Sequence, residues 1–162
     1  GMNLARCHLK HFGQSITADE KPWLVVDEPM TLTGKTVVIA RSLRYHNPRF
    51  NWREIMRRFG SRAVFIGTET EWNEFCREHG PVDYHRCANL LEVARMIAGA
   101  LLFIGNQSCP FAIAEGLKQN AILEVSPQAP NCIFPRDNAW AVRHTPFQLP
   151  NVDALRRVIP LP

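Results

Sequence analysis

The sequence lacks several patterns that would assign it to a familiar class of protein. No apolar run approaches the roughly 20 residues that cross a bilayer, and no signal-peptide pattern is recognisable at its start. Its five cysteines form no C-x-x-C pair, and their odd number and irregular spacing support neither a zinc site nor a disulfide framework. We therefore expect reduced thiols in a cytoplasmic protein without a membrane span.

Common nucleotide-binding and nucleic-acid-binding motifs are missing too. There is no Gly-Lys-Ser/Thr of a Walker loop and no G-x-G-x-x-G dinucleotide fingerprint. No acidic D-x-D pair is visible, so we expect neither a metal ion nor a cofactor. Arginines cluster between residues 41 and 62, but without an aromatic RNA-binding signature or a helix-turn-helix. Arg53, Arg57 and Arg58 fit the solvated face of a helix, and nucleic acid is not an expected partner.

The composition is that of one ordinary globular domain. The chain has 162 residues, of which 46% are hydrophobic and 21% charged, and its formal net charge is +4. Gly1 before Met2 resembles a scar of tag removal, so Met2 is the expected native start. We divide the chain into an N-terminal helix and linker, residues 1–34, and a Rossmann-like nucleotide-sugar-binding domain, residues 35–162.

Short apolar strands alternate with amphipathic helices along the chain. The pattern predicts strands at 36–40, 63–66, near Tyr84, 101–104, 121–125 and 139–142. It predicts helices at 3–12, 51–60, 68–80, 90–100, 110–117 and 152–159, with Asn51 as one N-cap and Thr68 with Glu71 as a capping box. Such alternation is typical of βαβ units, and we expect an α/β, Rossmann-like three-layer sandwich with a mostly parallel sheet.

The stretch from Leu101 to Leu117 is the strongest candidate for a site. It combines an apolar strand, the polar turn Gly105-Asn-Gln-Ser-Cys109, and a helix that starts near Pro110. A helix start presents free N–H groups and the positive end of the helix dipole, which favours a phosphate or carboxylate. A tight connection with Ser108 or Cys109 as a simple cap is the alternative interpretation.

Other predicted site residues follow neighbouring strands. Ligands of open parallel sheets bind beyond the carboxyl ends of the strands, near the point where the strand order reverses. The loops expected there begin at residues 41, 67, 105 and 126. Arg41, Ser42 and Arg44 could pair with a diphosphate there, and His46 is also expected near the site. Glu115 could accept hydrogen bonds from ribose hydroxyls, or be an exposed helix residue.

A covalent mechanism is a further alternative. Cys109 at a helix start could act as a nucleophile, and Ser108 could form a triad with Asp137 and His144. Against this, a nucleophile elbow has small residues two positions to either side of the serine, where this chain has Asn106 and Pro110.

Several of these blocks together resemble the C-terminal half of family 9 glycosyltransferases, the heptosyltransferase-like enzymes of the GT-B fold. The resemblance covers about residues 36–135. It rests on Ile39-Ala-Arg-Ser42, a helix from Trp52 to Met56, Gly67 to Glu71, Asn89-Leu90 before a helix, and Phe103-Ile-Gly-Asn106.

The resemblance implies a donor site and one half of a GT-B fold. In that family the turn contacts the diphosphate of a nucleotide-sugar. Here Gln107 replaces an acidic residue or threonine, Cys109 a glycine and Ala112 a histidine. Backbone contacts survive these changes and the histidine contact does not, so binding is better supported than turnover.

We therefore expect a glycosyltransferase-like domain that binds a nucleotide-sugar donor for sugar transfer. GT-B enzymes carry the acceptor and the catalytic base largely on an N-terminal domain, so a separate acceptor domain or a homodimer is the expected partner. No catalytic residue is assigned. A non-catalytic binding or assembly module is the main alternative, and a small Ser/Cys hydrolase the other. The predicted donor- and phosphate-binding residues are Arg41, Ser42, Arg44, Gly67, Thr68, Gly105, Asn106, Gln107, Ser108, Cys109, Pro110, Phe111 and Glu115.

Overall fold

Six parallel strands form one sheet at the centre of the molecule. The computed structural model describes residues 2–129 and 132–143. The strands are β1 (Val37–Ala40), β2 (Ala63–Ile66), β3 (Asp83–His85), β4 (Leu102–Asn106), β5 (Ala121–Glu124) and β6 (Ala139–Val142), and their order in the sheet is β3-β2-β1-β4-β5-β6. This is the doubly wound order of Rossmann folds. The predicted α/β class is confirmed, and every pairing of these strands is parallel.

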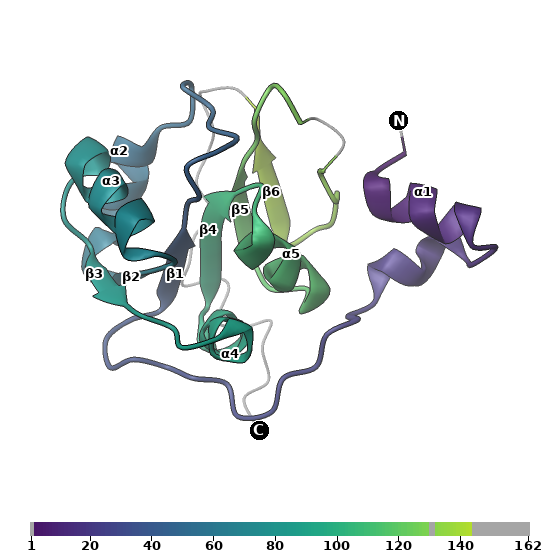
Figure 1. The fold of residues 1–162 in the computed structure, drawn as a ribbon, viewed down its shortest axis with the longest axis horizontal. Coiled ribbons are helices and arrows are strands. Elements are labelled where there is room, and N and C mark those ends of the chain that lie inside the picture. Colours follow the sequence, from purple (N-terminus) through teal and green to yellow (C-terminus); the bar gives the residue numbers. More distant parts are fainter. Residues whose placement is uncertain (1, 130–131, 144–162) are drawn as a thin grey trace.

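Helices cover both faces of the sheet (Figure 1). The first core cluster joins α2 (Trp52–Phe59) and α3 (Glu69–His79) to one face. The second joins α4 (Leu90–Gly99) and α5 (Cys109–Gly116) to the other. Successive strand residues point to opposite faces, so both faces of the central strands are apolar and buried. The outcome is the expected three-layer sandwich.

Local capping signals place the helix starts where the sequence predicts them. The Asn51 side chain accepts a hydrogen bond from the Glu54 N–H at 3.0 Å at the start of α2. At the start of α3, Thr68 and Glu71 form the reciprocal capping box. These bonds satisfy N–H groups that a helix start otherwise leaves without partners.

An arm and a long linker precede the sheet. Helix α1 (Leu4–His11) and the 3-10 helix η1 (Ile16–Glu20) form the arm, which lies to the side of the sandwich in Figure 1. The linker runs back beneath the sandwich and donates backbone hydrogen bonds from Trp23 and Leu24 to the Gly116 carbonyl. Helix α1 buries none of its residues.

Two further findings concern the predicted C-terminal helix and the length of the helices. The predicted helix at 152–159 lies outside the described residues. Within the described part of the chain, no helix is both long and apolar enough to traverse a bilayer.

Candidate functional site

The strand order reverses between β1 and β4, and this fixes the place where a ligand crevice is expected. The chain leaves β1 at Arg41 towards α2 and leaves β4 at Gln107 towards α5, on opposite faces of the sheet. Loops that diverge in this way open a crevice at the carboxyl edge of the sheet. Close approach of the two strands needs Gly105, because a Cβ there would lie 2.3 Å from the Ala40 carbonyl oxygen.

Asn106 joins the two loops that flank this crevice. Its Oδ1 accepts from the Ser42 N–H at 3.0 Å, and its Nδ2 donates to the carbonyls of Ser42 and Arg44. The side chain is fully buried, so its hydrogen-bonding groups hold the loop after β1 against the end of β4. The structure therefore brings the predicted residues Ser42, Arg44 and Asn106 together.

Arg41 turns away from the crevice. Its Nε donates to Glu124 at 2.9 Å, and a terminal nitrogen donates to Glu78 at 2.9 Å. Its side chain is only 7% exposed and lies over the Trp52 ring on the α2–α3 face. The Arg41 guanidinium, predicted to face a diphosphate, is thus paired with the carboxylates of Glu124 and Glu78.

Glu124 is a buried anchor that the sequence prediction did not include. Besides Arg41, it accepts from the Asn47 N–H at 2.8 Å and from the Trp52 indole N–H at 3.0 Å. Its exposure is 0%, and these donors satisfy the buried carboxylate. The signal in the sequence was a glutamate inside an otherwise apolar strand, 121–125.

The tip of the loop after β1 stays exposed. The Arg44 guanidinium lies 5.5 Å from the centre of the Tyr45 ring and has no carboxylate partner among the described residues. Tyr45 has a φ of 60°, in the left-handed region that few non-glycine residues adopt. His46 lies at the base of this tip, with Nε2 2.7 Å from the Ser42 carbonyl oxygen.

The turn after β4 opens into an uncapped helix start. Ser108 is the N-cap of α5, but its side chain makes no capping hydrogen bond and donates instead to the Asn106 carbonyl. The N–H groups of Cys109 and Phe111 in the first turn have no acceptor within the helix, and Pro110 has no N–H. Cys109 is exposed, and the Phe111 ring is buried in the core.

Gln107 supports this turn from behind. Its amide oxygen accepts from the Ser126 N–H at 2.9 Å, and its amide nitrogen donates to the carbonyls of Ala129 and Cys132. The side chain is buried. Gln107 therefore fixes the loop after β5 and leaves the open side of the turn to backbone groups.

The start of α3 is closed, unlike that of α5. The Glu71 carboxylate accepts from the Thr68 N–H at 2.8 Å and from the Thr68 hydroxyl at 3.0 Å. The Gly67 carbonyl accepts from the Tyr84 hydroxyl at 3.0 Å. The Glu71 carboxylate already occupies the place where an anion would bind at this helix start. Gly67 and Thr68 therefore have a structural role at the edge of the sheet.

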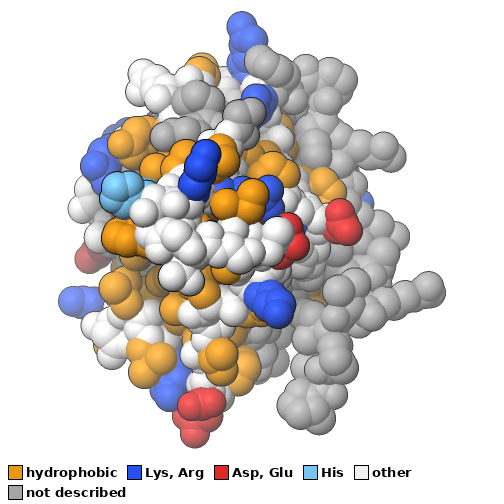
Figure 2. Space-filling model, turned by 90° about the vertical axis from the view of Figure 1, so that its right-hand side faces the viewer, with side chains coloured by type: hydrophobic (Ala, Val, Ile, Leu, Met, Phe, Trp, Pro, Cys, Tyr) orange, Lys and Arg blue, Asp and Glu red, His pale blue; other side chains and the backbone are white. Residues whose placement is uncertain are grey.

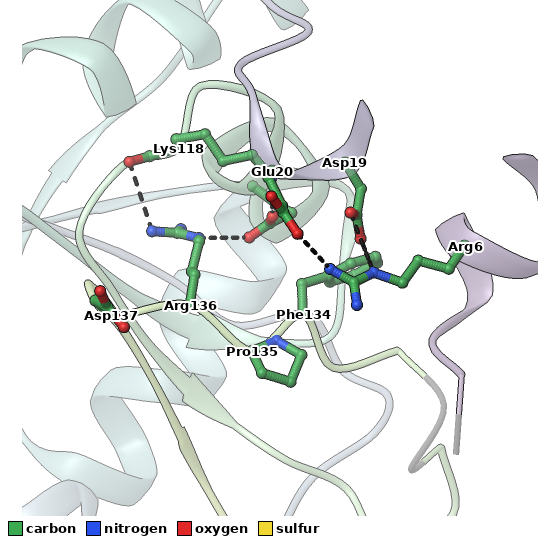
Figure 3. A pocket seen from close by; sticks show the side chains of 9 residues that line it. Arg6, Asp19, Glu20, Lys118, Phe134, Pro135, Arg136 and Asp137 are labelled. Carbon is green, nitrogen blue, oxygen red and sulfur yellow. Dashed lines mark hydrogen bonds and ion pairs between the residues drawn. The ribbon is translucent and has the colours of Figure 1, made fainter. Parts of the chain in front are cut away.

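Glu115 lies in another part of the molecule, at a cleft whose other lining residues are labelled in Figure 3. It lies six positions after Cys109 in α5, about 9 Å further along the helix axis. Its carboxylate accepts from Arg136 at 2.8 Å and from Lys118. It lines a cleft of about 280 Å³ between the arm and the sandwich, together with Arg6, Asp19, Glu20, Lys118, Phe134, Pro135, Arg136 and Asp137.

The position of Asp137 in this cleft argues against the Ser108–Asp137–His144 triad of the hydrolase alternative. Asp137 lines it and lies just before β6, at the amino edge of the sheet, whereas Ser108 follows β4 at the carboxyl edge. His144 lies outside the described residues. The structure therefore does not bring Ser108 and Asp137 together.

Burial and charge shift the pKa values of two groups next to Arg41. Burial lowers the pKa of His79 below its ordinary 6.5, and the positive charge of Arg41 lowers it further. Burial opposes ionisation of Glu78, but the hydrogen bond and charge of Arg41 outweigh it and lower that pKa. Among the described residues, no group of three or more His, Cys, Asp or Glu side chains could hold a metal ion.

The fold and the site define a class: a Rossmann-like α/β domain with an open helix start at its switch point. Comparison with known proteins goes no further, since no protein-family model, no curated protein and no solved structure matches the chain.

Proposed function

We propose that the chain is a glycosyltransferase-like domain that binds a nucleotide-sugar donor in the switch-point crevice. One observation carries the proposal. Asn106 fastens the loop after β1, which carries the exposed Arg44, to the end of β4, which leads into the uncapped start of α5. The motif resemblance to family 9 glycosyltransferases supports the same site.

The geometry suits a diphosphate in particular. The N–H groups of Cys109 and Phe111, which have no acceptor within the helix, favour negative charge at the helix start together with the α5 dipole. Arg44 supplies an exposed guanidinium that can form two hydrogen bonds to phosphate oxygens. When the sugar is transferred, these donors stabilise the charge that develops on the leaving diphosphate. The acceptor and the base come from a partner domain in this proposal.

Ligand titration tests the donor site. Calorimetry with a panel of nucleoside diphosphates and nucleotide-sugars should show binding, and Arg44→Ala should weaken it about tenfold by loss of a charge-assisted contact. Arg53→Ala is the matched control, because Arg53 is an exposed arginine on α2 and outside the crevice. Absence of binding at millimolar ligand by the folded wild-type protein would refute the proposal.

A second candidate function, an assembly module, is favoured by the arm. Figure 2 shows hydrophobic side chains gathered on the face of the molecule that carries it. An open apolar groove of about 350 Å³ runs along the arm, lined by residues that include Leu9, Phe12, Ala18 and Trp23. Phe12 is 72% exposed. Exposed apolar surface of this kind marks interaction sites, and we propose a second copy of the chain as the occupant.

A further inference from the structure

We propose that Tyr45 is the stacking platform for the base of the bound nucleotide. In this proposal Arg44 leaves the tyrosine ring for the phosphates when the ligand enters. The inference rests on the proposed donor site and adds the way in which the ligand is recognised: through a flat aromatic base as well as through its phosphates.

Buried groups on both sides anchor the loop that carries Tyr45. On one side, the Asn106 side chain holds the carbonyls of Ser42 and Arg44. On the other side, Asn47 donates from its backbone to Glu124 at 2.8 Å and from its side chain to the Val125 carbonyl at 2.8 Å. A loop fixed at both ends presents its tip in one conformation, and such preorganisation favours ligand binding.

The backbone of Tyr45 is strained, and its own side chain does not account for the strain. Its φ of 60° is unfavourable for a bulky residue. The ring is 40% exposed and belongs to neither hydrophobic core cluster. An outlier that the surrounding structure imposes on an exposed aromatic residue points to a functional use of that residue.

Arg44 covers the face that a base would use. Its guanidinium lies over the Tyr45 ring at 5.5 Å, a cation–π contact that is weak at an exposed site. A phosphate offers this guanidinium a stronger, charge-assisted partner. Movement of Arg44 to the phosphate would uncover the ring. The same movement would therefore form the phosphate contact and free the Tyr45 ring to stack on the base.

The tyrosine and the phosphate site are close along the carboxyl edge. The Arg44 carbonyl bonds directly to Asn106, which lies three residues before Cys109 at the start of α5. Leu43 adds a second exposed apolar side chain to the same loop tip. The site thus offers an apolar surface beside an anion site, as a nucleoside diphosphate requires.

The test compares two ligands that differ in the base. Affinities for ADP, GDP or UDP, whichever binds the wild-type protein best, and for inorganic pyrophosphate are measured on wild type, Tyr45→Ala and Tyr45→Phe. Tyr45→Ala should weaken nucleotide binding about tenfold through loss of stacking and leave pyrophosphate binding within about twofold. Tyr45→Phe keeps the ring and should bind like wild type. Arg53→Ala, at an exposed position of α2 away from this loop, is the control and should bind both ligands like wild type.

The outcomes separate this inference from the proposed function. If the wild-type protein binds the nucleotide but Tyr45→Ala binds it equally well, or loses both ligands equally, the stacking role is overturned and the donor site stands. If the folded wild-type protein binds neither ligand, both proposals fall. Thermal unfolding of each variant shows whether it is folded, and a Tyr45→Phe variant that loses nucleotide binding also contradicts the inference.

Discussion

At the scale of single residues, charged side chains at the carboxyl edge divide into buried anchors and exposed side chains. Arg41 and Arg44 are three positions apart in the sequence, yet two carboxylates enclose the first and the second lies on an aromatic ring at the surface. The difference follows the pleat of β1, because Arg41 continues the alternation that points Val37 and Ile39 to the α2–α3 face.

Glu124→Gln should destabilise the fold by about 3 kcal/mol, because it leaves the buried Arg41 guanidinium with Glu78 as its one charged partner. Urea unfolding followed by circular dichroism measures the change in the free energy of unfolding. Glu54→Gln removes an ion pair with Arg57 on the exposed surface and should leave that free energy nearly unchanged. Equal effects of the two substitutions would contradict the anchoring role.

His79 should make the fold sensitive to mild acid. Burial, and then the charge of Arg41, lower its pKa in the folded protein below the ordinary 6.5, so the unfolded chain binds the proton more tightly. The stability that neutral His79 contributes is therefore complete above pH 6.5 and is lost as the pH falls through the lower folded pKa.

The measurement is the free energy of unfolding at about pH 7.5 and about pH 5.5. His79→Gln should lose less stability over this interval than wild type does. His8→Gln removes an exposed histidine of α1 and should behave like wild type. A pH dependence unchanged by His79→Gln would disprove the assignment.

At the scale of elements, the pairing of β1 with β4 sets the place of the proposed donor site. Four residue pairs join these strands, and the last is Ala40 with Gly105. β1 ends there and β4 ends one residue later, and their loops diverge towards α2 and α5. The distance between the backbones at Gly105 therefore controls both the sheet and the site.

Gly105→Ala should destabilise the protein by about 3 kcal/mol, because the new Cβ meets backbone 2.3 Å away and the strands must separate. Thermal unfolding would show the lowered midpoint. Gly60→Ala is the matched control, since its Cβ would meet only the flexible end of Met56, at 3.3 Å. A Gly105→Ala protein as stable as Gly60→Ala would show that the strands tolerate the extra atom.

At the scale of the whole molecule, exposed apolar side chains gather in two regions. Seven of the eleven large hydrophobic residues that are exposed in the described chain belong to residues 2–25, and the other four, Leu43, Tyr45, Leu90 and Leu91, follow β1 and β3 at the carboxyl edge of the sheet. The first region is the arm and its linker. In the second, Leu43 and Tyr45 belong to the loop of the proposed donor site, and Leu90 and Leu91 begin α4.

If the arm binds a second copy, sedimentation velocity should show a dimer whose fraction rises with protein concentration. Phe12→Ser removes the most exposed ring of the groove and should return the protein to monomer. Leu90→Ser changes a comparably exposed residue outside the arm and should leave the dimer intact. A wild-type protein that stays monomeric at all concentrations would exclude the homodimer.

The sequence by itself determined the elements and the class of fold. Periodicity, capping residues and glycine stops are local signals, and they placed α2, α3 and the strands within a residue or two of their observed bounds. Backbone geometry at the start of α5 is equally local, so the sequence alone predicts an open helix start in the turn after β4.

Only the tertiary structure decided which side chains face the crevice. Arg41 meets Glu124 across 83 positions, and Gln107 and Glu115 are held by segments about 20 residues further along. The direction of a charged side chain depends on the buried partners that neighbouring strands place beside it. The order of the strands in the sheet, which decides these neighbours, is not encoded in any single strand. For the same reason the sequence does not set Arg44 and Tyr45 apart from their neighbours. Their exposed position at the loop tip depends on Asn106 and Glu124, which hold the two ends of the loop.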